Sequence, residues 1–212
     1  MKFLTRKFVT TVLLTMSLGG ALSACAPVII GGVVVGSIMA TDRRTAGIQI
    51  EDESIELRAA NGIREHLGER VHVNVTSYNR QVLLTGEVPS AQDKQLVEIV
   101  VSRVENVRAI VNETSVLGNA TLTQRTSDTL VTGRVKARLI DAKDLFANSF
   151  KVVTERGTTY LMGRVTLREA DRATEVVRST GGVQKVVRVL ELISEEELQN
   201  LLPKPVPATT PL

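Results

Sequence analysis

Few residues of this 212-residue chain are of a type that performs chemistry, and one of them stands in a distinctive setting. Cys25 is the only cysteine, so the chain cannot form a disulfide within itself. It closes the run Leu22-Ser23-Ala24-Cys25, which follows a stretch of apolar and small residues. The two histidines, His66 and His72, lie far from it in the sequence, and we expect both to be solvent-exposed or partly exposed.

These residues do not form a catalytic or metal-binding pattern. A lone cysteine and two histidines supply no set of zinc ligands, and no serine stands in a Gly-x-Ser-x-Gly turn that would make it a nucleophile. Gly86 and Gly163 lie inside strand-like patterns, where glycine marks close backbone approach, rather than in a glycine-rich loop that opens a helix. We therefore expect no enzyme activity, no metal and no cofactor.

The first 24 residues have the pattern of an export signal. Basic side chains open it, an apolar run fills 8–18, and small residues precede Cys25. Such a run is too short to span a bilayer comfortably. The last four residues, Leu-Ser-Ala-Cys, resemble the lipobox that directs acylation of the cysteine in bacterial lipoproteins. We therefore expect residues 1–24 to be removed and Cys25 to carry fatty-acyl chains such as palmitate; an incidental cysteine and an uncut anchor are the alternatives.

Removing this signal changes the charge of the protein. The whole chain has 26 basic and 23 acidic residues, but three basic residues lie within 1–24, which leaves 23 of each. Nucleic-acid binding, which depends on excess positive charge, loses its main support. Residues 25–47 then form a lipidated apolar tether and linker, because the glycine-rich run 26–40 falls short of the roughly 20 residues of a spanning helix.

The rest of the chain contains an internal repeat. The segment 84–88, Leu-Thr-Gly-Glu-Val, matches the segment 161–165, Leu-Met-Gly-Arg-Val, 77 residues later. In each copy an apolar stripe of helical period comes first, and two strand patterns follow with turns at 79–80 and 156–157. An amphipathic stretch and a β-branched run close each copy. The predicted helical stripes are Ile55, Ala59, Ile63 and Leu67 in the first copy, and Val131, Val135 and Leu139 in the second.

These two units resemble BON domains, small αββαβ modules of exported bacterial proteins, in their Leu-x-Gly-x-Val and Val-x-x-Val-Val segments. The resemblance implies an α+β fold with two BON domains in tandem, each a small three-stranded mixed sheet packed against two helices. We place the domains at 48–118 and 119–193, followed by a short helix and a proline-rich tail at 194–212. The arrangement as a whole is similar to that of dual-BON lipoproteins of the outer membrane.

The charge of the two domains differs. Residues 48–118 carry 7 basic and 11 acidic side chains, whereas 119–193 carry 13 basic and 8 acidic ones. Anionic lipid attracts a basic surface by roughly 1 kcal/mol for each Lys or Arg near it, so the second domain is the better candidate for a membrane contact. Next to the core stripe of its first helix lies a row of Leu130, Arg134 and Arg138, with Gly133 and Ala137 on the same flank.

On the residues alone, a leucine at the margin of the core with two solvated arginines is the simpler interpretation of this row. The resemblance instead implies that the helix binds anionic phospholipid and that the protein supports outer-membrane integrity. The alternative is a protein-interaction or chaperone-like module that acts with outer-membrane assembly or cell-wall partners. Ala26 stands where aspartate would favour inner-membrane retention, so we expect a lipid anchor in the outer membrane that faces the periplasm, with surface display left open.

Overall fold

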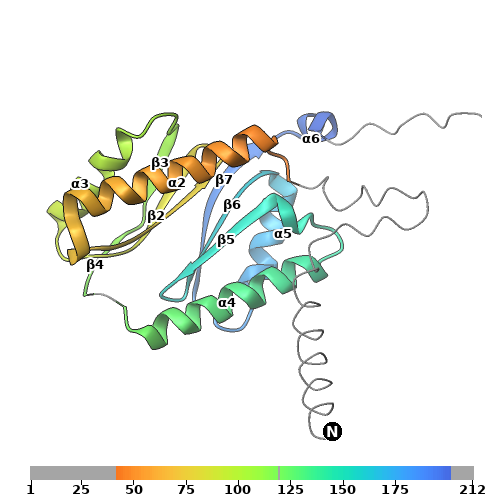
Figure 1. The fold of residues 1–212 in the computed structure, drawn as a ribbon. Helices are drawn as coiled ribbons and strands as arrows, with labels where there is room; N and C mark the ends of the chain where they lie inside the picture. Colours follow the sequence, from red (N-terminus) through yellow and green to blue (C-terminus); the bar gives the residue numbers. More distant parts are fainter. Residues whose placement is uncertain (1–41, 119, 202–212) are drawn as a thin grey trace, which may run out of the picture. The chain divides into compact units, whose positions relative to one another are not determined.

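The computed structural model describes residues 42–118 and 120–201, and Figure 1 shows the order of their helices and strands. The predicted signal peptide, Cys25 and the proline-rich tail lie outside the described residues. Within 42–118 and 120–201, no helix is both long enough and apolar enough to cross a membrane. The described chain forms two units of the same αββαβ order.

The first unit is a mixed sheet with two helices. Strands β1 and β2 form an antiparallel hairpin, and β3 and β4 each pair in parallel with β2. Its elements are α2 (Ala46–Leu67), β1 (His72–Tyr78), β2 (Gln81–Val88), α3 (Ala91–Ser102), β3 (Ala109–Asn112) and β4 (Ser115–Val116).

The second unit repeats this plan. Strands β5 and β6 form the hairpin, and β7 lies parallel to β6, so that the strand order is β5-β6-β7. Its elements are α4 (Leu122–Asp141), β5 (Phe150–Glu155), β6 (Thr158–Thr166), α5 (Leu167–Arg178) and β7 (Lys185–Ile193), after which comes α6 (Glu195–Leu201). The predicted fold class is therefore confirmed.

The closing strand of the first unit differs from the uninterrupted strand that the sequence predicts. It is broken between β3 and β4, so the first sheet has four strands instead of three. The cause is local: the side chain of Asn112 accepts hydrogen bonds from the backbone N–H and hydroxyl of Thr114, and Lys94 donates to the Thr114 carbonyl. A side chain that bonds the backbone two residues on competes with the strand ladder.

A buried aspartate in each unit ties the first helix to the hairpin turn. Asp52 on α2 accepts the backbone N–H groups of Asn79 and Arg80 at 2.8 and 2.7 Å. Asp128 on α4 accepts those of Arg156 and Gly157 at 2.8 and 3.0 Å. All four turn residues have positive φ, the backbone of a tight two-residue hairpin turn. The carboxylate thus satisfies two donors that the turn leaves unpaired.

Three apolar clusters hold the described residues together. One lies between the helices and sheet of each unit, and the predicted stripes of α2 and α4 belong to them. The third cluster joins the two sheets, which identifies it as the contact between the units. Polar contacts surround it, among them Lys151 Nζ to Glu56 at 2.6 Å and Asn79 Nδ2 to Glu191 at 2.6 Å. The third cluster consists of Tyr78, Leu83, Tyr160, Met162 and Val189.

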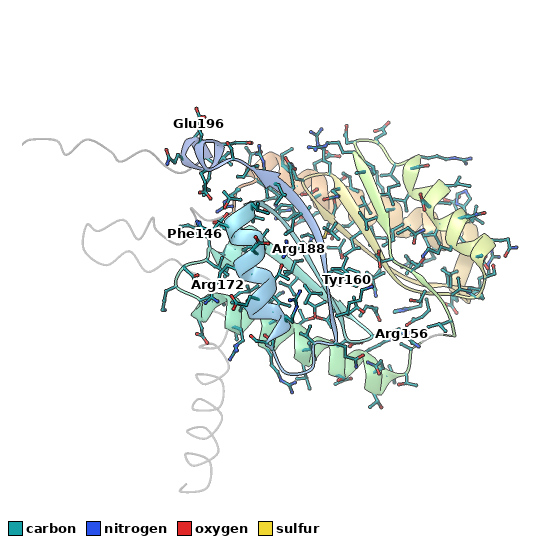
Figure 2. All side chains as sticks on the ribbon, turned by 180° about the vertical axis from the view of Figure 1, so that it is seen from behind. Phe146, Arg156, Tyr160, Arg172, Arg188 and Glu196 are labelled. Atoms are coloured by element: carbon teal, nitrogen blue, oxygen red, sulfur yellow. The ribbon has the colours of Figure 1, made fainter. Side chains whose placement is uncertain are left out.

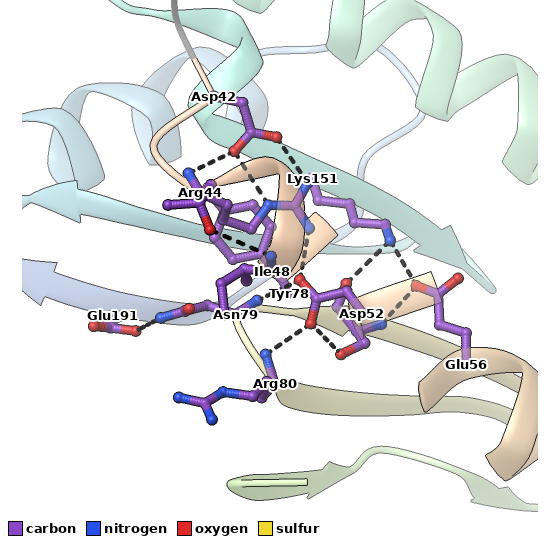
Figure 3. A network of polar contacts seen from close by, with 12 residues as sticks. Asp42, Arg44, Ile48, Asp52, Glu56, Tyr78, Asn79, Arg80, Lys151 and Glu191 are labelled. Atoms are coloured by element: carbon purple, nitrogen blue, oxygen red, sulfur yellow. Dashed lines mark hydrogen bonds and ion pairs between the residues drawn. The ribbon is translucent and has the colours of Figure 1, made fainter. Parts of the chain in front are cut away.

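Two neighbouring arginines shortly before α2 each bind a different unit. Arg43 makes a bidentate ion pair with Glu169 on α5 at 2.7 and 2.6 Å, with side chains only 4% and 1% exposed. Arg44 turns the other way: it pairs with Asp52 at 2.8 Å and lies 4.2 Å from the centre of the Tyr78 ring (Figure 3). We call Arg43, Arg44 and these partners the clasp.

Candidate functional site

The candidate site is the outward surface of α4, which begins at a capped end. Thr121 is the N-cap, and its hydroxyl accepts the backbone N–H of Gln124 at 3.2 Å. Val131, Val135 and Leu139 are at most 3% exposed and face the sheet, as their spacing predicts. With one face of the helix buried in this way, the residues on its opposite side are directed to solvent.

The residues predicted to bind lipid lie together on this outward surface. Leu130 is 57% exposed, so it does not lie at the margin of the core as the simpler interpretation had it. Gly133, Arg134, Ala137 and Arg138 are exposed as well. The structure therefore brings all five residues to one solvent-facing side of α4.

A shallow groove of about 310 Å³ separates α4 from the loop that follows α5. On one side it is lined by Arg134, Ala137 and Arg138. On the other side, the Gly181 carbonyl accepts from Arg134 at 3.3 Å and the Ser179 hydroxyl accepts from Arg138 at 3.4 Å. These long contacts hold the two guanidiniums near the mouth of the groove while leaving further N–H donors of each available.

Sequence reasoning missed part of this surface. Leu122 and Ile140 are 80% and 64% exposed, and both project from the same side of the helix as Leu130. At about 100° per residue, these three residues with Gly133 and Ala137 fill a sector of about 80°. Extending the helical projection beyond Leu130 to both ends of the predicted helix would have found them. We call this sector the outer stripe of α4.

Cationic side chains border the outer stripe on both sides. Arg134 and Arg138 lie on one edge, and Lys136 lies on the other. None of the three has an acidic partner within 4.0 Å among the described residues. By contrast, Arg172 on α5 and Arg188 on β7, both labelled in Figure 2, pair with Asp144 and Asp171, each at 2.8 Å. These three cations of α4 thus have no ion pair, in a fold that pairs many of its other arginines.

Each of the two histidines lies close to an oxygen atom of the protein. His66 Nδ1 lies 2.8 Å from the Gly62 carbonyl, as expected for a helical surface position. His72 Nδ1 lies 3.0 Å from the buried Glu87, which Arg156 of the other unit also contacts at 3.3 Å. Nearby, burial and the charge of Glu87 raise the pKa of Glu155. In the part of the chain that the structure describes, no group of acidic, His or Cys side chains could hold a metal ion.

Comparison with known proteins agrees with the repeat. The model of the BON domain family matches residues 56–118 and 127–194. The chain is 33% identical over 174 residues to the outer membrane lipoprotein DolP of Haemophilus influenzae, which covers 81% of this chain and 90% of that protein. It is 32% identical over 154 residues to the 21 kDa hemolysin of Actinobacillus pleuropneumoniae, covering 72% and 79%. A solved structure of CdsD of the Chlamydia trachomatis type III secretion system aligns with a TM-score of 0.29 at 15% identity, over 70% of this chain and 97% of that one.

Proposed function

Because this chain belongs to the BON domain family and is related to envelope lipoproteins of the outer membrane, we propose that its second domain binds anionic phospholipid through the outer stripe of α4. The observation that carries the proposal is the combination of an exposed apolar stripe with unpaired cations along its edges. An apolar stripe alone would suit many partners, and free cations alone would suit any anion.

The two features together suit the surface of a membrane. An interfacial helix places its apolar side chains at the boundary of the acyl chains while flanking Lys and Arg meet the phosphates. Leu122, Leu130 and Ile140 are long enough to reach that boundary, and Gly133 and Ala137 between them let the helix backbone approach it. The apolar area supports insertion, and each free cation adds about 1 kcal/mol at an anionic surface.

Two threonines, Thr126 on the stripe and Thr129 beside it, do not oppose this contact, whereas the exposed carboxylate of Asp141 beside the last turn of the stripe does. Thr126 and Thr129 donate their hydroxyl groups to the carbonyls of Leu122 and Arg125, each at 2.9 Å. A hydroxyl that is bonded to its own helix leaves a methyl group facing outward and has less to lose when water is removed. The solvent side of α4 is therefore less polar than its sequence alone indicates.

We further propose that Cys25 carries the lipid that makes the protein a lipoprotein, and that the anchor lies in the outer membrane facing the periplasm. A single acyl chain gives only marginal binding to a membrane. A second contact through α4 would hold the folded domains against the same bilayer. A protein that links its domains to the bilayer in this way would support outer-membrane integrity.

Vesicle co-sedimentation tests the proposal. The unlipidated mature chain should bind vesicles that contain phosphatidylglycerol and leave neutral phosphatidylcholine vesicles in solution. Leu130→Glu and Arg134→Glu should each weaken binding about fivefold or more, since each alters a group at the interface by one charge or more. The matched controls are Leu57→Glu and Arg103→Glu, which change an exposed leucine and an unpaired arginine of the first domain.

Thermal unfolding separates a lost contact from a lost fold. Both α4 variants should keep the midpoint of the wild type, because the two side chains are exposed. Equal binding of the wild type, Leu130→Glu and Arg134→Glu to anionic vesicles would remove α4 from the membrane contact. Retention of an envelope protein by the same surface in the absence of lipid would then favour the protein-interaction alternative.

A further inference from the structure

A second hollow lies on the other side of α4, where its first turn meets the first unit. Its volume is about 340 Å³, and its wall includes the end of α2 and the start of β1. Arg64 lines it from α2, and Arg125 lines it from α4. The buried side chains of Ile63 and Val71 also line it, beside the two charged groups.

Both guanidiniums lack a protein partner. Neither Arg64 nor Arg125 has an acidic group within 4.0 Å or a side-chain hydrogen bond among the described residues, and the Nε–H of Arg125 is shielded from solvent without an acceptor. In the same unit as Arg64, the side chains of Arg58, Arg70 and Arg108 are all ion-paired. Arg64 is one of four basic residues of this domain without an ion pair in the described part of the chain, and it is the one that lines the hollow.

We propose that this hollow binds a phosphate group between Arg64 and Arg125. Guanidiniums bind phosphate oxygens in a bidentate manner, and two of them from different elements can hold a phosphate from two sides. The site would give the first domain a part in anion binding. It uses neither the outer stripe nor its bordering cations, so it goes beyond the function proposed above.

The surroundings of the hollow define its ligand further. Glu69 also lines it and is exposed without an ion-pair partner, so this carboxylate opposes an anion and lowers the affinity of the site. His72 also lines the hollow, and its Nδ1 lies 3.0 Å from Glu87. An adjoining hollow of about 220 Å³ shares Arg125, but it also contains Asp128 and Glu155 and does not suit an anion.

The first arm of the test uses the unlipidated mature chain and vesicles that contain phosphatidic acid, whose headgroup is a phosphomonoester. Arg64→Gln and Arg125→Gln should each weaken binding about fivefold, the value for one charge at an anionic surface. Glu69→Gln should strengthen binding by a similar factor. Arg103→Gln removes an unpaired arginine of the same domain away from the hollow, and it should change binding much less.

The second arm uses inorganic phosphate followed by NMR of the arginine side chains. If phosphate shifts the Arg64 and Arg125 signals while the vesicle arm shows no difference, the ligand is a soluble phosphate compound. Should Arg64→Gln match Arg103→Gln on vesicles and phosphate leave both signals unmoved, the proposal is overturned. Arg64 lies on α2 and not on α4. A failure of the outer stripe to bind lipid would therefore leave the effect of Arg64→Gln unchanged, so the two proposals can fail separately.

Discussion

Replacing Arg43 by alanine should destabilise the protein although this residue lies outside both segments that match the BON family. The substitution leaves Glu169 buried, at 1% exposure, without its bidentate partner. Removing one member of a buried ion pair costs about 3–5 kcal/mol. Glu169 keeps one hydrogen bond, since its Oε2 also accepts the backbone N–H of Thr166 at 3.0 Å, so the lower end of that range applies. At about 2–4 °C per kcal/mol for a chain of this size, the unfolding midpoint should fall by roughly 6–12 °C.

The loss should depend on pH in a defined direction. Burial raises the pKa of Glu169, but the hydrogen bonds from Arg43 and from the Thr166 N–H outweigh it and hold the pKa below the ordinary value of 4.5. A depressed pKa contributes stability above the unfolded value, and this contribution is lost as the pH falls through the folded value. Arg43→Ala removes most of that contribution, so the two midpoints should differ most near neutral pH and converge in acid.

Thermal and urea unfolding of the mature chain at several pH values measures both effects. Arg172→Ala is the matched control, because it breaks ion pairs whose side chains are 40% and 51% exposed and should cost at most about 1 kcal/mol. Adding Glu169→Gln to Arg43→Ala should cost less than the sum of the single changes, since it removes the unpaired charge. A midpoint within 1 °C of the wild type for Arg43→Ala, or a loss of equal size at all pH values, would refute this account of the clasp.

Three further changes test the fold. Asp128→Asn removes the charge that accepts two backbone N–H groups of the hairpin turn, and it should cost about 2 kcal/mol in urea unfolding. Gly86→Ala places a Cβ 2.1 Å from the His72 carbonyl oxygen at a φ of +106°, so a soluble variant should unfold at lower temperature. Glu155→Gln removes a carboxyl group whose pKa is raised by burial and by the charge of Glu87. A raised pKa means that ionisation of Glu155 destabilises the wild type as the pH rises, so the variant should be the more stable protein at pH 7.5 and should lose this advantage near pH 4.5.

The elements of both units could be predicted from the sequence because their causes are local. The stripe of Ile55, Ala59 and Ile63 has the period of a helix with one buried face, and the turn at 156–157 contains a glycine that accepts positive φ. The structure supports the structural interpretation of Gly86 and Gly163, since a Cβ on Gly86 would lie 2.1 Å from the His72 carbonyl oxygen of β1 and one on Gly163 would lie 2.5 Å from the Ser149 carbonyl oxygen just before β5.

The clasp, which sequence analysis missed, depends on contacts between distant residues. Arg43 and Glu169 are 126 residues apart, and neither belongs to a periodic pattern that indicates a partner. Nor does the sequence decide whether Leu130 is exposed, because a residue beside a core stripe is buried or exposed according to what packs next to it. The break before β4 arises from a side-chain bond of Asn112, which competes with a β-branched run that otherwise predicts one strand.

The internal repeat offers a final test of why α4, and not α2, would bind lipid. On the opening helices α2 and α4, residues 76 positions apart occupy equivalent places, as Asp52 and Asp128 do, so Arg58 corresponds to Arg134. In the first unit Arg58 pairs with Glu51 at 2.8 Å, whereas the equivalent of Glu51 in the second unit is the exposed Ser127, and Arg134 has no ion pair among the described residues.

Ser127→Glu should therefore give Arg134 the ion pair that Arg58 has in the first unit. It should weaken binding to phosphatidylglycerol vesicles although every arginine of α4 is kept. Thr123→Glu adds the same charge to the same helix, but eleven residues before Arg134 and out of its reach. In both variants the added negative charge weakens the attraction to an anionic surface. Only in Ser127→Glu does the new carboxylate also pair with the guanidinium of Arg134. The expected order of affinity is wild type, Thr123→Glu, then Ser127→Glu; equal losses for the two variants would mean that the freedom of Arg134 is not what distinguishes the second domain.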